Sequence, residues 1–295
     1  MSGTLHVVGG GVAGLAAALA AVRSGRTVVL HEASAQFGGR CRAVAGHDNG
    51  THVLLGANRA AFGFLEAIGA RAGWIEPEPD GLPIVDLARG SVRALALSPW
   101  QWTNPDQRPP GLGWQALLDL GRLMLSAADR PVADMVRPGP LLAAMVEPLT
   151  LAALNTPIRE ASSQKLGRVL RRLASPGSAR LFVAKGGLGP DLIEPALATL
   201  RKLGVTLQCG SRLTGLGIDG RRVWRLDLRG TGIALDRSDA VILALPPRYL
   251  ARLLPGLQVP TRHEPIVNLH LATSYTGRTR FIGLVGGLAQ WMLVR

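Results

Sequence analysis

Residues 5–14 read Leu5-His6-Val7-Val8-Gly9-Gly10-Gly11-Val12-Ala13-Gly14, and this stretch decides the fold. Its first four residues are apolar and β-prone, which predicts a short buried strand. Gly9, Gly11 and Gly14 then give the spacing G-x-G-x-x-G. In a dinucleotide-binding turn the first glycine permits the tight turn, the second lets backbone approach a pyrophosphate, and the third lets helix pack on strand. The run from Val12 to Ala21 is almost entirely Ala, Leu and Val, which predicts a buried helix whose N-terminus faces the phosphates.

An acidic residue completes the motif. Residues 26–31 are predicted to form a second strand, and Glu32 follows it at about the separation from the glycines that a ribose-binding acid requires. A carboxylate there accepts hydrogen bonds from ribose hydroxyls and repels a 2′-phosphate, which argues against NADP. A glycine-rich turn without a ligand is the alternative interpretation. With Gly38-Gly39-Arg40 shortly after Glu32, the whole pattern favours FAD over NAD.

Composition fits an α/β enzyme. The chain has 295 residues, 47% of them hydrophobic and 37 of them glycine, which is unlike a disordered or fibrous protein. Cys41 and Cys209 lie far apart with no C-x-x-C motif, so neither a disulfide framework nor a zinc site is supported. We expect two unpaired thiols in a reducing cytosol and no metal site.

Two apolar stretches resemble membrane segments. Residues 5–22 are apolar enough for a signal peptide or a span, but no basic segment precedes them and Gly9–Gly11 would break the helix. Residues 141–154 are interrupted by Glu147 and Pro148, and no stretch reaches the roughly 20 apolar residues that a span needs. We therefore expect a soluble or peripheral cytoplasmic protein.

The charge is strongly positive. A net charge of +13 suits an anionic lipid surface or a nucleic acid. Aromatic residues make up only 4% of the chain and no basic run of five occurs, so nucleic-acid binding is disfavoured. Only three residues are lysine, so an arginine bias that merely reflects genome composition remains open. Peripheral contact with an anionic membrane, at its inner face, is the functional interpretation that we favour.

Periodicity predicts further elements along the chain. Helices are expected over residues 58–69, 114–127, 141–154, 162–173 and 191–203, and strands over 82–87, 92–97, 205–207, 212–218, 222–228, 240–244, 266–272 and 281–285. A second G-x-G-x-x-G occurs at Gly215, Gly217 and Gly220. Asp219-Gly220 there is typical of a hairpin turn and no helix follows, so we expect a single dinucleotide site.

The Gly38-Gly39-Arg40 segment resembles the FAD-dependent amine oxidase and phytoene desaturase superfamily, whose members place G-G-R just after the ribose-binding acid. The resemblance implies that the double glycine lets backbone pass close to the cofactor and that Arg40 neutralises pyrophosphate charge. Residues 205–213 are similar to the strand beside adenine, with Leu213 where the superfamily usually has valine. The fold implied is α/β: a Rossmann-like FAD-binding domain of the glutathione-reductase-like type with an interleaved α+β substrate domain.

A closer resemblance is to the hydroxysqualene dehydroxylase family, also described as squalene-associated FAD-dependent desaturases. It lies in residues 48–56, 154–157, 264–267 and 284–287 with 290–291, and Thr51 stands where the family usually has glutamine. Relatives carry a late Gly-Asp segment that covers the flavin, and residues 250–295 contain no counterpart, so a C-terminally truncated member is expected. The resemblance assigns residues 1–75 and 181–250 to the FAD-binding domain, 76–180 to a mostly helical substrate domain and 251–295 to substrate-domain strands.

The activity implied is reductive dehydroxylation of hydroxysqualene to squalene in bacterial squalene and hopanoid biosynthesis, with an unidentified electron donor. A long isoprenoid requires an apolar tunnel, whose walls we place in the helices of residues 110–175 and the strands after residue 260. Three alternatives remain open: a carotenoid desaturase, an amine oxidase of the same superfamily, or an inactive truncated remnant that holds no flavin.

The resemblance also places Gly50, Thr51 and His52 under the flavin ring. Histidine as a residue type can donate a proton near neutral pH, and His52 is the candidate catalytic acid, although it could instead only orient flavin or backbone. Asp48 is a weaker candidate because Asp48-Asn49-Gly50 could simply build a turn, and His263 and His270 look structural. The expected cofactor-binding residues are Gly9, Gly10, Gly11, Val12, Ala13, Gly14, Glu32, Gly38, Gly39, Arg40, Gly50, Thr51, His52 and Leu213.

Overall fold

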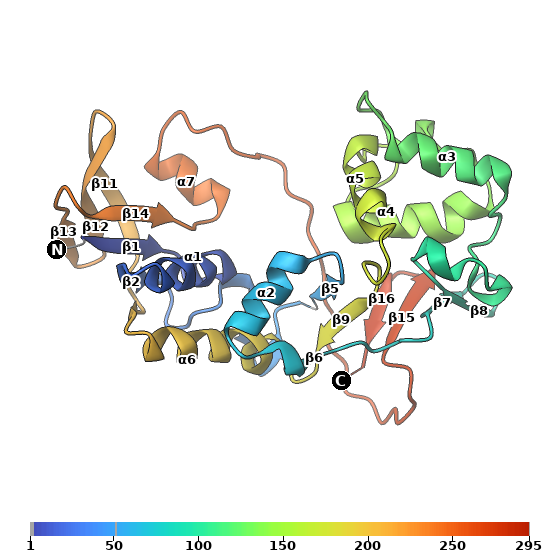
Figure 1. The fold of residues 1–295 in the computed structure, drawn as a ribbon, viewed down its shortest axis with the longest axis horizontal. Coiled ribbons are helices and arrows are strands. Elements are labelled where there is room, and N and C mark those ends of the chain that lie inside the picture. The colour runs from blue at the N-terminus through green and yellow to red at the C-terminus, as the bar shows by residue number, and fades with distance from the viewer. Residues whose placement is uncertain (1–2, 51, 295) are drawn as a thin grey trace.

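A four-stranded parallel sheet lies at the centre of one of the two lobes of the molecule (Figure 1). The computed structural model describes residues 3–50 and 52–294. Every neighbouring pair in this sheet is parallel, as a Rossmann-like fold requires. The α/β class and these strands are therefore confirmed. In sheet order they are β10 (Thr206–Gln208), β2 (Thr27–His31), β1 (Thr4–Val8) and β14 (Ala240–Leu243).

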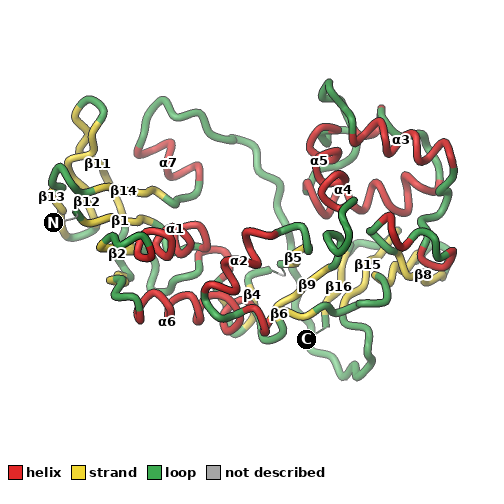
Figure 2. The backbone as a smooth tube through the Cα atoms, in the orientation of Figure 1, coloured by secondary structure: helices red, strands yellow, loops and turns green. Residues whose placement is uncertain are grey.

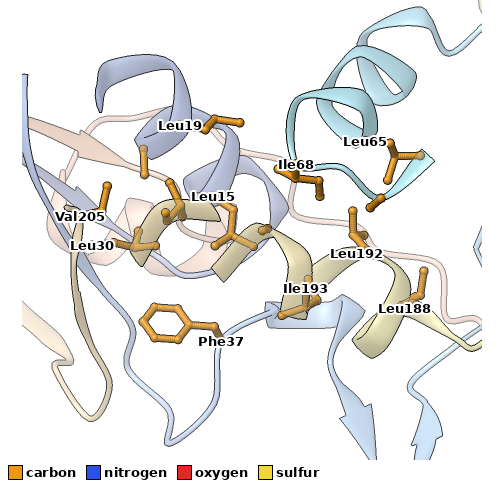
Figure 3. Close-up of a cluster of buried hydrophobic side chains, with 14 of the residues drawn as sticks. Leu15, Leu19, Leu30, Phe37, Leu65, Ile68, Leu188, Leu192, Ile193 and Val205 are labelled. Carbon is orange, nitrogen blue, oxygen red and sulfur yellow. The ribbon is translucent and has the colours of Figure 1, made fainter. Parts of the chain in front are cut away.

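Helices and the sheet enclose the core of this lobe. Helix α1 (Val12–Arg23) packs on the sheet, and α6 (Glu194–Lys202) packs against α1. Figure 3 shows Leu15 of α1, Leu30 of β2 and Val205 close together, and Ile193 near the segment that carries Phe37. Leu15 and Leu30 are fully buried, and each such side chain stabilises the fold by roughly 2 kcal/mol.

Small antiparallel sheets extend the same lobe and lead out of it. Residue Gly220, in left-handed backbone at φ +57°, turns β11 into β12, which confirms the predicted hairpin. The hairpin sheet is β11 (Leu213–Asp219), β12 (Arg222–Leu228) and β13 (Thr231–Ala234); the others are β3 (Ala43–Val44) with β4 (His47–Asp48), and β5 (Val53–Leu55) and β6 (Trp74–Ile75) on either side of β9 (Leu181–Ala184). Helix α2 (Arg59–Ala67) follows β5, and the sequence analysis missed α7 (Pro247–Leu253).

The second lobe combines a mixed sheet with a group of helices (Figure 1). Its sheet has the order β16-β15-β7-β8, formed by Trp291–Leu293, Phe281–Val285, Leu82–Asp86 and Ser91–Leu95. Strands β15 and β7 are parallel neighbours although they lie far apart in the sequence. A second buried cluster includes Leu123, Val132 and Leu166. The helices are α3 (Trp114–Met124), α4 (Glu147–Leu154) and α5 (Ser163–Leu173).

Short helical turns join these elements; most are 3₁₀ turns, and two are wider π-helical turns. The 3₁₀ turns are Gly39–Cys41, Arg71–Gly73, Pro99–Gln101, Pro105–Gln107 and Val132–Asp134. The predicted helices over 141–154 and 191–203 each begin instead with a π-helical turn, at Leu142–Val146 and Gly189–Ile193. Each is followed within two residues by a proline, Pro148 or Pro195. Proline lacks an N–H and its ring crowds the carbonyl four residues earlier, and a wider turn relieves that conflict.

The strand predicted over residues 266–272 is wrong. Within the described residues this stretch has no strand assignment and pairs with no other strand. Figure 2 shows it as part of the long loop between α7 and the second lobe. Ile266, Val267, Leu269 and Leu271 are mostly exposed. Alternating apolar residues form a strand only where a neighbouring strand takes up their backbone hydrogen bonds.

Gly14→Ala should lower the free energy of unfolding by about 1–3 kcal/mol, because the added Cβ would meet the carbonyl oxygen of Gly9 at 1.8 Å. Urea denaturation of the purified chain measures this. The matched control is Gly63→Ala in the middle of α2, where nothing lies within 4 Å of the added Cβ. It should stabilise by about 0.5–1 kcal/mol. Equal effects of the two substitutions would contradict the close contact.

Candidate functional site

The glycine-rich turn between β1 and α1 divides its three motif glycines into two kinds. A Cβ on Gly9 would lie 2.3 Å from the carbonyl oxygen of Ala244, and one on Gly14 would strike Gly9 itself. Gly9 also adopts φ +112°, a conformation that favours glycine. A Cβ on Gly11 would instead meet only the Cα of Gly39, at 3.9 Å. The first and third glycines therefore permit packing, whereas the second borders open space.

The N-terminus of α1 points its free amides toward that space. Gly11 is the N-cap residue, no side chain caps the helix, and no acidic residue occupies its first turn. The first N–H groups of a helix have no acceptor within it, so those of Val12 and Ala13 are available to a ligand. The partial positive charge of the helix end favours an anion there. This arrangement suits a pyrophosphate.

The carboxylate of Glu32 is held at the end of β2 by three hydrogen bonds. Its Oε2 accepts the backbone N–H of Gly10 at 2.8 Å. Its Oε1 accepts the backbone N–H of Ser34 at 2.8 Å and the Ser34 hydroxyl at 2.6 Å. The acid is thus oriented beside the glycine turn. Sequence analysis missed Ser34, for which the only signal was a hydroxyl two positions after the acid.

The two glycines of the G-G-R segment lie directly against the turn. The N–H of Gly38 donates to the carbonyl of Gly10 at 2.8 Å, and Gly38 forms a parallel bridge with Gly11. Gly38 and Gly39 have φ of +111° and +56°, which disfavour any other residue. Arg40 is exposed and makes no ion pair within residues 3–50 and 52–294, so its guanidinium is available to an anion.

The segment that leads to Leu213 lies next to Glu32. The N–H of Ser211 donates to the carbonyl of Glu32 at 2.8 Å, and that of Gly210 to the carbonyl of Ser34 at 3.0 Å. Leu213 then begins β11. The structure therefore brings together the glycine turn, the acid, the G-G-R segment and the approach to Leu213. We call this group of segments the cradle.

The segment that carries His52 is arranged differently. Gly50 is buried, and His52 is exposed with its Nδ1 3.0 Å from the carbonyl oxygen of Gly50. A carbonyl only accepts, so Nδ1 carries the proton and Nε2 holds the lone pair of the neutral ring. In the described part of the chain no hydrogen bond joins His52 to the glycine turn. Thr51 lies outside the described residues.

Asp48 has a structural contact. It is buried at the end of β4, and its two carboxylate oxygens accept the N–H of Leu188 at 2.9 and 3.1 Å. Asp48 therefore anchors the segment that leads into α6. The turn of the β3–β4 hairpin uses Ala45 and Gly46, both with positive φ, rather than Asp48-Asn49-Gly50. His270 stacks on His47 with ring centroids 5.1 Å apart.

An apolar cavity of about 450 Å³ lies in the second lobe, bordered by α3 and α5. Its volume is within the usual range of small-molecule sites, and almost all of its lining is hydrocarbon. The lining includes Leu97, Trp102, Leu120, Met145, Leu149 and Leu173. The cavity can therefore hold an apolar ligand. Part of its lining comes from the helices of residues 110–175, where tunnel walls are predicted, and none of it comes from the strands after residue 260.

Two buried histidines lie behind the cradle. His6 Nδ1 is 3.0 Å from His31 Nε2, and His31 Nδ1 is 3.0 Å from the Ser211 hydroxyl. Burial, with a smaller effect from His6, lowers the pKa of His31 to about 4, and burial also lowers the pKa of His6. Neutral His31 thus uses both ring nitrogens to tie β1 and β2 to the segment beside Glu32.

Comparisons with known proteins agree with this geometry. Residues 7–68 match the NAD(P)-binding Rossmann-like domain family. The chain is 37% identical to hydroxysqualene dehydroxylase from Rhodopseudomonas palustris over 99% of its own length and 73% of the relative's. It is 33% identical to the enzyme of that name from Sinorhizobium fredii over the same shares. The chain belongs to the hydroxysqualene dehydroxylase family.

Family membership confirms the resemblance and the oxidoreductase class inferred from the sequence. The fold also matches cyclohexylamine oxidase from Brevibacterium oxydans with a TM-score of 0.58 at 15% identity, over 86% of this chain and 60% of that one. The domain match covers the glycine turn, Glu32 and the G-G-R segment described above. Among the described residues no helix has both the length and the apolar character to cross a bilayer.

Acid should weaken the fold through His31. Its pKa is lower in the folded chain, at about 4, than the usual 6.5, so the unfolded chain binds more protons between those values. The contribution of neutral His31 to the free energy of unfolding is fully present above pH 6.5. It falls by about 3 kcal/mol as the pH drops toward 4. Urea midpoints measured from pH 7.5 to 4.5 test this.

His31→Gln should remove most of that slope, whereas His263→Gln, in an exposed loop, should leave it intact. An unchanged slope in His31→Gln would show that other groups govern the acid sensitivity.

Proposed function

We propose that this chain binds FAD and catalyses the reductive dehydroxylation of hydroxysqualene to squalene. The observation that carries the proposal is the match to relatives named hydroxysqualene dehydroxylase along 99% of the chain. The cradle around Gly11 and the apolar cavity beside α5 support it, because the reaction requires both a dinucleotide site and a water-poor space for a long hydrocarbon.

The residues around the glycine turn fit FAD. The amides of Val12 and Ala13 and the guanidinium of Arg40 would hold the pyrophosphate in the space that Gly11 leaves open. Glu32 would accept hydrogen bonds from the ribose hydroxyls, with Ser34 keeping its carboxylate in position. Gly9, Gly10, Gly14, Gly38 and Gly39 would let the backbone come close, and Leu213 would lie beside the adenine.

The same proposal gives each part of the chain a role. Residues 1–75 and 181–250 would hold FAD, and residues 76–180 and 251–295 would hold the substrate. The pairing of β15 with β7, and the position of the apolar cavity between α3 and α5, support this division. The isoprenoid would lie in that cavity, where few polar groups compete for it.

The chemistry needs a proton, a hydride and exclusion of water. Protonation of the substrate hydroxyl lets it leave as water, and the resulting cation is delocalised over the neighbouring alkene. When bound in its reduced form, FAD supplies the hydride that converts this cation to squalene, with its two electrons drawn from an external donor. The apolar walls around Leu120, Met145 and Leu173 would keep bulk water from the hydrocarbon chain.

His52 is the proposed acid. Its Nδ1 proton is used by the Gly50 carbonyl, so the proton that it gives to the departing hydroxyl would come from Nε2 of the imidazolium form. The hydrogen bond to Gly50 would fix the direction of the ring. Gly50 would contact the flavin from the same segment.

The protein would act in the cytoplasm at the membrane surface. Its substrate and product are hydrocarbons that partition into a bilayer, and its net charge of +13 favours an anionic one. Peripheral contact at the inner face of the membrane is therefore part of the proposal.

Gly11→Ala tests the cofactor site without disturbing the fold. The backbone at Gly11, with φ −75° and ψ 178°, accepts alanine, and the new methyl group would meet only Gly39. It would occupy the space assigned to the pyrophosphate, so FAD affinity measured by calorimetry should fall at least about tenfold. The urea midpoint should stay unchanged. FAD binding equal to that of wild type would show that the pyrophosphate lies elsewhere, and Gly63→Ala serves as the control.

Product analysis tests the reaction. The purified chain, supplied with FAD and chemical reductant under nitrogen, should convert hydroxysqualene to squalene and leave phytoene unchanged, as followed by gas chromatography. His52→Ala should retain FAD but lose turnover about 100-fold or more. Desaturation of phytoene would favour a carotenoid desaturase instead. Undiminished turnover in His52→Ala would contradict the acid role. If the wild-type chain binds FAD but forms no squalene, the proposed function is wrong.

A further inference from the structure

Two cavities of opposite character lie on either side of α5. The apolar cavity uses Leu170, Leu173 and Ala174 from the end of this helix. A second cavity, of about 500 Å³, uses the intervening positions of the same helix. Its lining is Arg59, Arg168, Arg171, Arg172, Ala57, Ser175 and Ser178. One helix therefore separates a hydrocarbon-lined space from an arginine-lined one.

The positive charge of the second cavity is not neutralised by neighbours. No acidic side chain lines it, and α5 itself carries none. In the described part of the chain, none of its four arginines makes an ion pair. Arg171 donates to the carbonyl of Met124, and Arg168 acts at longer range on Asp129, whose carboxylate accepts from Ser162. Four exposed guanidinium groups thus converge on one hollow, which suits phosphate oxygens.

Exposed aromatic and aliphatic side chains line the mouth of the apolar cavity and extend along α3, and one of them, Trp100, reaches the edge of the basic cavity. Trp100 and Leu117 line the apolar cavity, yet they are 65% and 51% exposed, so the cavity opens to the outside. The indole N–H of Trp100 donates to the carbonyl of Ala174 at 2.7 Å, immediately before Ser175 of the basic cavity. Trp114 and Leu125, at the two ends of α3, are even more exposed. Tryptophan beside arginine is the pairing that membrane interfaces favour.

We propose that this docking face, formed by Arg59, Arg168, Arg171, Arg172, Trp100 and Leu117, binds an anionic phospholipid bilayer. Lipid phosphates enter the arginine cavity, Trp100 lies at the headgroup level, and the apolar cavity opens toward the acyl chains. An isoprenoid passes from bilayer to cavity without crossing water. The route of the isoprenoid rests on the proposed function, whereas the docking itself needs no turnover.

The charge and the apolar opening together select this partner. A nucleic acid or a phosphorylated protein would use the arginines but would leave Trp100 and Leu117 exposed to water. A hydrophobic protein surface would cover the apolar opening but would offer no counterions to the four exposed arginines that it covers. An anionic bilayer satisfies both parts with one molecule type, since each lipid carries a phosphate and a hydrocarbon chain.

Vesicle sedimentation of the purified full chain tests the proposal. The chain should bind vesicles of phosphatidylcholine with 30% phosphatidylglycerol much more tightly than vesicles of phosphatidylcholine alone, and about 0.5 M NaCl should weaken binding strongly. Arg59→Gln/Arg168→Gln/Arg172→Gln should reduce binding on the order of 100-fold, at about fivefold for each arginine near the surface. Arg171 is left in place because it also holds Met124.

Matched variants separate this face from general charge. Arg221→Gln/Arg229→Gln/Arg237→Gln removes the same charge from exposed positions in the β11–β13 region. Its loss of vesicle affinity should be at least about tenfold smaller than that of the first triple variant. Trp100→Ala should weaken binding at constant charge. Thermal melting confirms that each variant is folded.

Three results would overturn the docking face. Equal losses in the two triple variants would mean that net charge alone drives adsorption. Unchanged binding in Trp100→Ala would remove the interfacial role of the apolar opening. Calorimetric binding of inorganic phosphate without vesicle binding would assign the arginine cavity to a soluble anion. None of these results depends on squalene formation, so failure here leaves the proposed reaction separately testable.

Discussion

The close approach of α1 to β1, where Gly14 meets the carbonyl of Gly9, controls the geometry of the glycine turn and of the segments packed against it. With any side chain at Gly14 the helix would move away from the sheet. Its first amides would then no longer border the opening at Gly11, and Gly10 would lose its simultaneous contacts with Glu32 and Gly38. The rest of the cradle, including the left-handed backbone at Gly38 and Gly39, is arranged around this one contact.

The parts of the fold that local chemistry determines were predictable. The strand from Leu5, the helix from Val12, the acid at Glu32 and the hairpin at Gly220 follow from short-range rules that hold in almost any context. The predicted strand over 266–272 failed because a strand requires a partner, and the identity of a partner is a tertiary property. The wide turns before Pro148 and Pro195 show the same limit, since periodicity predicts the helix but not how its first turn accommodates a proline.

The site was predictable to a similar degree. The placement of the glycines and Glu32 around one turn could be predicted because it depends on backbone conformation and spacing. The hydrogen bond from Ser34 to Glu32 and the one from Leu188 to Asp48 could not be predicted. Each depends on how the folded chain brings its two partners together. The buried pair His6 and His31 also escaped notice, because two histidines in apolar strands resemble ordinary strand residues until their rings meet.

One connection in the second lobe affects how the protein is made. The parallel neighbour of β7 is β15, in which Gly283 pairs with Ile84. Strand β7 therefore cannot complete its pairing until β15 has been synthesised. During translation the ribosome releases β7 and β8 as a hairpin, with the edge of β7 that later pairs with β15 left open while the rest of the polypeptide emerges. Closing so long a loop is entropically costly and slow. Nascent chains should therefore recruit chaperones at this edge, and folding of the second lobe should be the late, aggregation-sensitive step in the cell.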